Sequence, residues 1–202
     1  MTSRDASGGY NAIATEFMAA RSDSGSTVVR NWAATLPHGS KVLDIGAGSG
    51  VPLTAILIDT GMAVFAIDAA PALVSAFRKR FPGVDIACDH ALTSPMLDRR
   101  FDAILSVGLV FLLSESDQRT LIGRMARALS PNGRLLMSAP KQAGTWTDLL
   151  TDRPSLSLGE DAYRTLFAAN DMTLADMFTD AGGSNYYSLR KSSASLESSS
   201  PA

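Results

Sequence analysis

The feature that most constrains this chain is a short apolar run that ends in three glycines at alternate positions. Residues 41–50 have the sequence Lys-Val-Leu-Asp-Ile-Gly-Ala-Gly-Ser-Gly, and a second apolar run follows over 51–58. The first run is typical of a strand buried on both faces, and the second favours a helix. A sharp strand-to-helix turn through glycines leaves backbone N–H groups facing the sheet edge. The motif predicts an α/β domain with a ligand site at the tip of this strand. The alternative is a tight glycine-rich turn that binds no ligand.

The spacing of the glycines bears on the kind of ligand. A dinucleotide site has the pattern Gly-x-Gly-x-x-Gly. Counted from Gly46, the third glycine position is Val51, and the glycine comes one residue early, at Gly50. Asp44 also stands two residues before the first glycine, where its negative charge would meet a pyrophosphate. The spacing therefore disfavours a nicotinamide-dependent oxidoreductase and suits a ligand that carries a cation.

A second acidic residue follows the next predicted strand. Residues 62–67 are apolar and end at Asp68, eighteen residues after Gly50, which is about what one helix and one strand require. A carboxylate at that tip can accept hydrogen bonds from both ribose hydroxyls. Asp68 can also cap the helix that begins near Pro71. The two roles are compatible, and we favour ribose binding. A third strand over 84–88 is followed by Asp89.

These residues carry a resemblance to a known family. Val-Leu-Asp-Ile-Gly-Ala-Gly-Ser-Gly resembles the first motif of class I S-adenosylmethionine (AdoMet)-dependent methyltransferases. Phe-Asp-Ala-Ile-Leu at 101–105 and Leu-Ser-Pro-Asn-Gly-Arg-Leu at 129–135 resemble later motifs of the same family. The likeness covers about residues 10–191 and is to small stand-alone bacterial enzymes. It implies a Rossmann-like α/β fold with a seven-stranded, mostly parallel sheet, helices on both faces and a C-terminal antiparallel hairpin.

The resemblance also implies roles for individual residues. Asp44 would orient the amino group of the cofactor, Asp68 would hold its ribose, and Asp89 would accept from the adenine amino group. Tyr10 and Arg21 would close over the methionine carboxylate, although packing for Tyr10 and a solvated charge for Arg21 are an equal alternative. The expected AdoMet-binding residues are Asp44, Gly46, Ala47, Gly48, Gly50, Asp68, Ala69, Asp89, Tyr10, Arg21 and Gly108.

The remainder of the chain completes the expected domain. Residues 1–9 are expected to be frayed and 192–202, a Ser-rich tail, to be disordered, leaving one domain over 10–191. Residues 140–159 are the least regular segment and a candidate binding loop. Cys88 is expected to be an inert, buried thiol. The other expected helices cover about 10–18, 26–36, 71–81, 114–129 and 161–170, and the other strands 103–107, 135–139, 173–178 and 186–189.

The acceptor is only partly constrained. Residues 108–113 are wholly apolar, whereas methyltransferases of exocyclic amines carry Asn/Asp-Pro-Pro-Tyr there. The net charge is −2, and no basic run exceeds Arg-Lys-Arg at 78–80, so a nucleic-acid acceptor is not expected. Trp146 is a candidate wall or lid, with core packing equally favoured. We expect a small, partly hydrophobic acceptor; a protein or RNA acceptor, or a non-catalytic AdoMet-binding protein, stays an alternative.

No catalytic residue is assigned from the sequence. A base is needed only for a hydroxyl or an acidic carbon, and Asp148, His90 and Tyr186 are equal candidates. One cysteine and two histidines make an internal disulfide framework impossible and a structural zinc site unexpected. The 202 residues contain no signal-peptide pattern or membrane span, so a cytoplasmic location is expected. The oligomeric state is not predicted.

Overall fold

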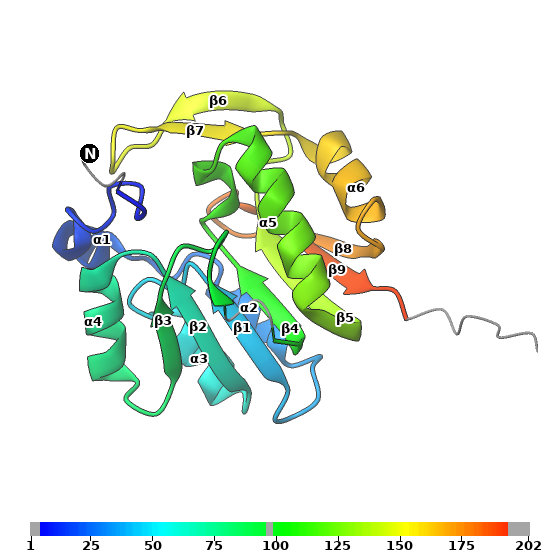
Figure 1. Cartoon of the computed structure of the whole chain (residues 1–202), viewed down its shortest axis with the longest axis horizontal. Helices are drawn as coiled ribbons and strands as arrows, with labels where there is room; N and C mark the ends of the chain where they lie inside the picture. Colours follow the sequence, from blue (N-terminus) through cyan, green and yellow to red (C-terminus); the bar gives the residue numbers. More distant parts are fainter. Residues whose placement is uncertain (1–4, 96–98, 194–202) are drawn as a thin grey trace, which may run out of the picture.

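A seven-stranded sheet forms the centre of the molecule. The computed structural model describes residues 5–95 and 99–193. The strands of the main sheet are β1 (Lys41–Ile45), β2 (Ala63–Asp68), β3 (Asp85–Cys88), β4 (Phe101–Ser106), β5 (Leu129–Ser138), β8 (Met172–Thr179) and β9 (Asn185–Lys191). Their order is β3-β2-β1-β4-β5-β9-β8 (Figure 1). The first five are parallel, and β9 is antiparallel to both β5 and β8. The expected fold class, including the final hairpin, is confirmed.

Helices cover both faces of this sheet. They are α1 (Ala14–Ala20), α2 (Ser26–Ala33), α3 (Leu53–Asp59), α4 (Pro71–Arg80), α5 (Glu115–Ala128) and α6 (Glu160–Ala168), with a 3₁₀ turn, η2 (Val110–Leu112). Leu43 and Ile45 of β1 face the cluster with α5 and α6, whereas Val42 faces the cluster with α2 and α3. Both faces of β1 are therefore buried, as its apolar sequence predicts.

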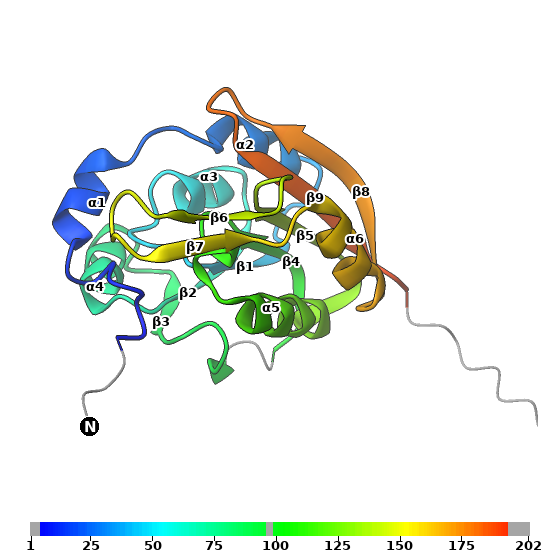
Figure 2. The same cartoon turned by 90° about the horizontal axis from the view of Figure 1, so that it is seen from above.

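The carboxyl ends of the parallel strands meet at one edge of the sheet, and a second, two-stranded sheet lies across that edge. It consists of β6 (Gly144–Thr147) and β7 (Pro154–Ser157), paired antiparallel (Figures 1 and 2). The prediction that 140–159 is irregular is wrong here. The two strands have only four residues each, and β6 is exposed along its whole length, so neither carries a strong apolar alternation.

The first turn of the chain also differs from expectation. Helix α1 begins at Ala14 rather than Tyr10. Residues 5–9, expected to be frayed, form turns in which Asp5 accepts hydrogen bonds from the amides of Ser7 and Gly9. Residues 1–4 and 194–202 lie outside the described residues, as do 96–98, so the domain bounds and the disordered tail stay predictions.

Two smaller predictions also need correction. A side-chain cap from Ser26 or Thr27 is absent, because Gly25 precedes α2 and supplies none. Cys88 is exposed, because it is the last residue of β3, which is the edge strand of the sheet. Over residues 5–95 and 99–193, no helix is long and apolar enough to cross a membrane, and the cytoplasmic location stays a prediction. In the same ranges, no group of three His, Cys, Asp or Glu is arranged to hold a metal ion.

Candidate functional site

The glycine loop turns the chain from β1 towards α3. Gly46, Gly48 and Gly50 all have positive φ, between 59° and 82°, which side chains rarely tolerate. At Gly50 the space is occupied by neighbouring rings: a Cβ there would lie 2.5 Å from Phe81 and 2.9 Å from Phe77. A glycine at position 50 is thus required by the packing of α4 as well as by the turn.

Asp68, at the tip of β2, ties this loop to the neighbouring strand. Its Oδ2 accepts the N–H of Gly48 at 2.8 Å, and its Oδ1 accepts the N–H of Ala70, across Ala69, at 2.8 Å. Burial raises the pKa of this carboxyl, and the two backbone donors oppose that shift. Asp68 therefore holds the turn before α4 and fixes the glycine loop as well, but it does not cap the helix, because the N-cap of α4 is Ala70 and no side chain caps it.

Asp44 lies on β1, the strand adjacent to β2, and is 3% exposed. The hydroxyl of Thr54 donates to its Oδ2 at 2.6 Å. Burial raises the pKa of Asp44 to about 6; the Thr54 bond opposes this, the charge of Asp68 adds to it and Arg21 opposes it. The carboxylates of Asp44 and Asp68 thus lie at the tips of adjacent strands. The guanidinium of Arg21 is close enough to affect the pKa of Asp44.

Three side chains from the N-terminal region lie over the glycine loop. The ring of Phe17 would be 3.3 Å from a Cβ on Gly48. Tyr10 meets this ring edge-to-face with centroids 5.2 Å apart, and the Arg21 guanidinium carbon is 5.2 Å from its centroid. Tyr10 and Arg21 are thus brought to the site. Phe17 contacts both of them, whereas the sequence predicts it only as an apolar residue of a helix.

The tips of β3 and β4 extend the same edge. The N–H of Asp89 donates to the carbonyl of Asp68 at 3.0 Å, and its Oδ2 accepts from Ser94 at 3.3 Å. After β4, the N–H of Gly108 donates to Ser138 at 2.8 Å, and a Cβ on Gly108 would meet no atom within 4 Å. Leu109 packs beside Gly46. The strand tips and the N-terminal region therefore bring together every residue that the sequence assigned to the cofactor.

The β6–β7 hairpin and the N-terminal segment form a cover over this edge. We use "cover" for residues 5–21 together with 144–157. The Tyr10 hydroxyl donates to Asp148 at 3.2 Å, and Arg153 forms an ion pair with Asp5 at 3.2 Å. Beneath the hairpin, the rings of Trp146 and Phe111 pack with centroids 5.7 Å apart. Trp146 is 37% exposed and is therefore not a core residue.

Comparison with known proteins agrees with this geometry. A family model described as a methyltransferase domain matches residues 42–133, which include the glycine loop and the tips of β1 to β4. The sheet order and the terminal antiparallel pair complete the pattern of that family's fold. Residues 42–133 thus resemble a methyltransferase domain, and the described chain has the class I AdoMet-dependent methyltransferase fold.

Curated relatives share part of this methyltransferase domain. A mouse protein named probable tRNA methyltransferase 9B is 34% identical over 111 residues, which is 54% of this chain and 24% of that protein. A Schizosaccharomyces pombe protein named an uncharacterized methyltransferase-like protein is 28% identical over 48% of this chain and 36% of its own length. The chain thus spans about a quarter to a third of the length of these relatives.

Solved structures share the fold of the methyltransferase domain at low sequence identity. The aminopentose methyltransferase CalS10 of Micromonospora echinaspora, with bound AdoMet, superposes with a TM-score of 0.68 at 19% identity, covering 89% of this chain and 95% of that one. A putative Haloferax volcanii methyltransferase, in complex with the activator Trm112, gives 0.75 at 16% over 93% and 97%. The [4+2]-cyclase SpnF gives 0.65 at 17% over 82% and 81%.

The three candidate bases in the methyltransferase domain all have local partners. Asp148 accepts from the amides of Leu150 and Thr151 and from the hydroxyl of Tyr10, so its carboxylate organises the hairpin turn. The hydroxyl of Tyr186 donates to Asp180 at 2.8 Å, and burial raises its pKa, which opposes deprotonation. The Nδ1 of His90 accepts from the amide of Leu92 at 3.3 Å. These contacts do not single out one of the three as the base.

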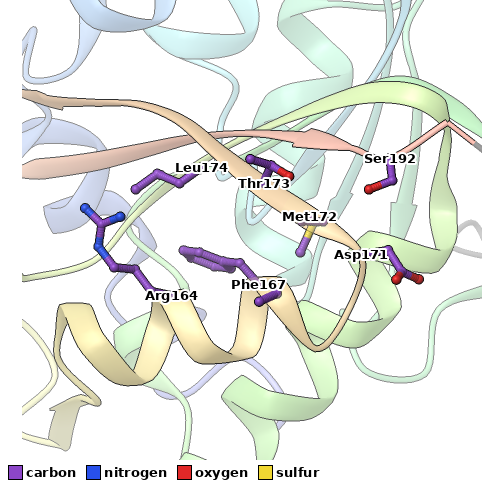
Figure 3. A pocket seen from close by; sticks show the side chains of 8 residues that line it. Arg164, Phe167, Asp171, Met172, Thr173, Leu174 and Ser192 are labelled. Carbon is purple, nitrogen blue, oxygen red and sulfur yellow. The ribbon is translucent and has the colours of Figure 1, made fainter.

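A separate groove lies between α6 and β8. Figure 3 shows Phe167, Met172 and Leu174 along it, with Arg164 at one end. Arg164 already pairs with Glu160 at 2.7 Å. The groove shares no residue with the strand-tip edge of the methyltransferase domain.

Proposed function

We propose that this chain transfers a methyl group from AdoMet to a small, partly hydrophobic acceptor. The observation that carries the proposal is the pair of carboxylates, Asp44 and Asp68, at the tips of adjacent parallel strands beside the glycine loop. The positive charge of Arg21 is close enough to Asp44 to lower its pKa. An amino acid joined to a nucleoside presents complementary groups: an ammonium, a carboxylate and a pair of ribose hydroxyls.

The donors and acceptors at the edge fit AdoMet group by group. Asp44 would hold the ammonium, with Arg21 and Tyr10 near the carboxylate. Each oxygen of Asp68 accepts one backbone N–H and keeps a second lone pair for a ribose hydroxyl. Asp89 would accept from the adenine amino group. The remaining backbone contacts would come from Gly46, Ala47, Gly48, Gly50, Ala69 and Gly108.

The protein's own contribution is positioning and the exclusion of water. When bound, AdoMet supplies a methyl group that its sulfonium already activates. The cover lies over the strand tips, and a site closed to water strengthens the interactions of Asp44 and Asp68 with their ligand groups. The rings of Phe111 and Trp146 provide an apolar wall beside this edge. No proton transfer is assigned to a side chain, because the geometry does not distinguish one base among the three candidates.

An RNA acceptor is the second candidate. It is favoured by the 34% identity with the mouse protein named as a probable tRNA methyltransferase. The net charge of −2 and the apolar 108–113 segment favour a small molecule instead. SpnF, which has a similar fold, is described as a [4+2]-cyclase. Methyl transfer by this chain therefore needs a direct assay.

Calorimetric titration with AdoMet and S-adenosylhomocysteine tests the cofactor site. We expect Asp68→Ala to lose roughly 100-fold in affinity, about 3 kcal/mol, because the two ribose hydroxyls lose a charged acceptor. Asp68→Asn, which keeps one oxygen, guards against a folding failure of the alanine variant. Asp59→Ala, an exposed acid at the end of α3, is the matched control. Equal affinity of the folded Asp68 variants and the parent would show that the ribose assignment is wrong.

The acceptor class is tested by incubating the protein with methyl-labelled AdoMet and fractionated cell extract. We expect the label in the small-molecule fraction. Label in tRNA, or in protein, would reject a small acceptor and favour the corresponding alternative. Tight AdoMet binding with no S-adenosylhomocysteine released in any fraction would identify a non-catalytic binding protein.

A further inference from the structure

A fully buried glutamine joins the cover to the body of the domain. Gln118, in the first turns of α5, is 0% exposed. Its Nε2 donates to the carbonyl of Leu113 at 3.0 Å and to that of Leu156 at 2.8 Å. Its Oε1 accepts the hydroxyl of Tyr163 at 2.7 Å. Both donors and the acceptor of this side chain are used, so the group is buried without loss of hydrogen bonds.

The partners of Gln118 come from three other elements. Leu113 follows η2, Leu156 lies in β7, and Tyr163 is on α6. The Tyr163 hydroxyl also accepts the amide of Leu158, which follows β7, at 3.3 Å. The side chain of Gln118 therefore fixes the distance between η2 and the β6–β7 hairpin. Figure 1 shows α5 beneath the β6–β7 hairpin, with α6 beside it.

The separation of η2 and the hairpin also determines how the rings of Phe111 and Trp146 are placed. Leu156 is paired with Thr145, and its neighbour Ser155 is paired with Trp146. Phe111 lies in η2, two residues before Leu113. Gln118 thus holds one strand of the hairpin that carries Trp146 and the turn that carries Phe111, the two rings that pack together.

We infer that Gln118, with Tyr163, is a positioning residue that sets the separation of Phe111 and Trp146. Its effect on the choice of acceptor rests on the proposed function, but its effect on the hairpin does not. If Gln118 is replaced by an apolar residue, the carbonyls of Leu113 and Leu156 lose a buried donor, and the Tyr163 hydroxyl loses the acceptor for its proton. Opening the hairpin brings water to those groups, so the cover opens more readily while the sheet keeps its structure.

Tryptophan fluorescence provides a test that needs no acceptor. The chain has two tryptophans, and Trp32 is only 3% exposed, so acrylamide quenching reports mainly on Trp146. We expect Gln118→Met to raise the quenching constant about twofold at a temperature well below unfolding. Gln142→Met, at an exposed glutamine, should leave it unchanged. Trp146→Phe supplies the residual signal of Trp32.

A second variant keeps the test decisive. Tyr163→Phe removes one hydroxyl and should shift quenching in the same direction by a smaller amount, even where Gln118→Met fails to fold. Unchanged quenching in whichever of these two variants folds would overturn the inference and leave Gln118 a core residue only. AdoMet affinity should stay within twofold in both, whereas absence of AdoMet binding to the parent would reject the proposed function without altering the quenching result.

Discussion

The strand tips and the cover lie on opposite sides of the same site, and they are held in different ways. At the strand tips, Asp44 and Asp68 are bonded to Thr54, Gly48 and Ala70, all within a stretch of 27 residues, 44–70. In the cover, the Tyr10–Asp148 and Asp5–Arg153 contacts join residues 138 and 148 positions apart. The side chains of the ion pair are nearly half exposed.

This difference separates a fixed half from a half that can open. A hydrogen bond to a buried charge contributes about 1.5–3 kcal/mol, whereas an exposed ion pair contributes about 0–1 kcal/mol. The strand tips are thus preorganised by strong hydrogen bonds, whereas the two parts of the cover, residues 5–21 and 144–157, are joined to each other by contacts that thermal motion can break. A site of this kind keeps its ligand-binding geometry while admitting and releasing small molecules.

The largest effect expected in the fixed half is that of Gly50→Ala. The new Cβ would overlap Phe81 and Phe77 in a backbone conformation with positive φ, so we expect a loss of about 3 kcal/mol in the free energy of unfolding. Gly108→Ala is the matched control, because Gly108 also has positive φ but open space around it, and should cost about 1 kcal/mol. Urea denaturation measures both. Equal losses would mean that packing against α4 is not what requires glycine at position 50.

The next effect concerns the buried charge of Asp44. Because the pKa is raised to about 6 in the folded protein, the folded state holds this proton more tightly than the unfolded chain does. The contribution of Asp44 to the free energy of unfolding is therefore largest at acidic pH, and it is lost as the pH rises from about 4 through 6. Asp44→Asn keeps an acceptor for Thr54 and avoids the loss, so the variant should be more stable than the parent by up to about 3 kcal/mol at pH 8.

Denaturant unfolding from pH 4 to pH 8 measures this difference. The advantage of Asp44→Asn should grow between pH 4 and 6 and level off above pH 7. Asp23→Asn, in an exposed loop, is the control. A constant difference across the range would show that Asp44 is not the group responsible. The stabilised variant should also bind AdoMet more weakly, since its ammonium loses a charged partner.

In the cover, Tyr10→Phe removes the bond to Asp148 but keeps the ring against Phe17. We expect the dissociation rate of AdoMet to rise about fivefold, corresponding to about 1 kcal/mol, and the free energy of unfolding to change little. Stopped-flow displacement measures the rate. The association rate serves as an internal control and should not fall. A loss of global stability comparable to that of Gly50→Ala would contradict the view that this contact holds only the cover.

The smallest effect is expected for Asp5→Asn, which removes the ion pair with Arg153 and keeps an oxygen acceptor for the amide of Ser7 or of Gly9, but not for both. Hydrogen exchange of the amides over 148–153 should rise no more than about twofold at low salt, and the difference should vanish in 1 M salt because the pair is exposed. Mass spectrometry of peptic fragments measures it. A salt-independent increase would indicate that Asp5 acts through its turn rather than through its charge.

The fixed half could be predicted from the sequence because its determinants are adjacent in the chain. A buried strand, three glycines and an acid after the next strand specify their own geometry locally, and they led to the correct sheet and to the residues at its edge. The helix-capping alternative for Asp68 was wrong, because its carboxylate holds the turn one step before the N-cap, Ala70. Whether these residues bind AdoMet stays a prediction.

The cover could not be predicted because its determinants are distant contacts. Strands of four residues such as β6 carry too little pattern, and nothing near Tyr10 in the sequence points to Asp148. Gln118 was overlooked because it is polar, yet it stands three, four and seven residues before Leu121, Ile122 and Met125, on the buried face of α5. A polar residue in register with an apolar helical face is the signal that would have found it.

The long separation between Asp5 and Arg153 has a consequence for how the chain acquires its structure. During synthesis, Asp5 is made almost 150 residues before its partner Arg153. Closing so long a loop costs chain entropy that one ion pair does not repay, so this segment should dock after the sheet has formed. Asp5, made well before Arg153, would then be among the last residues to reach their native positions.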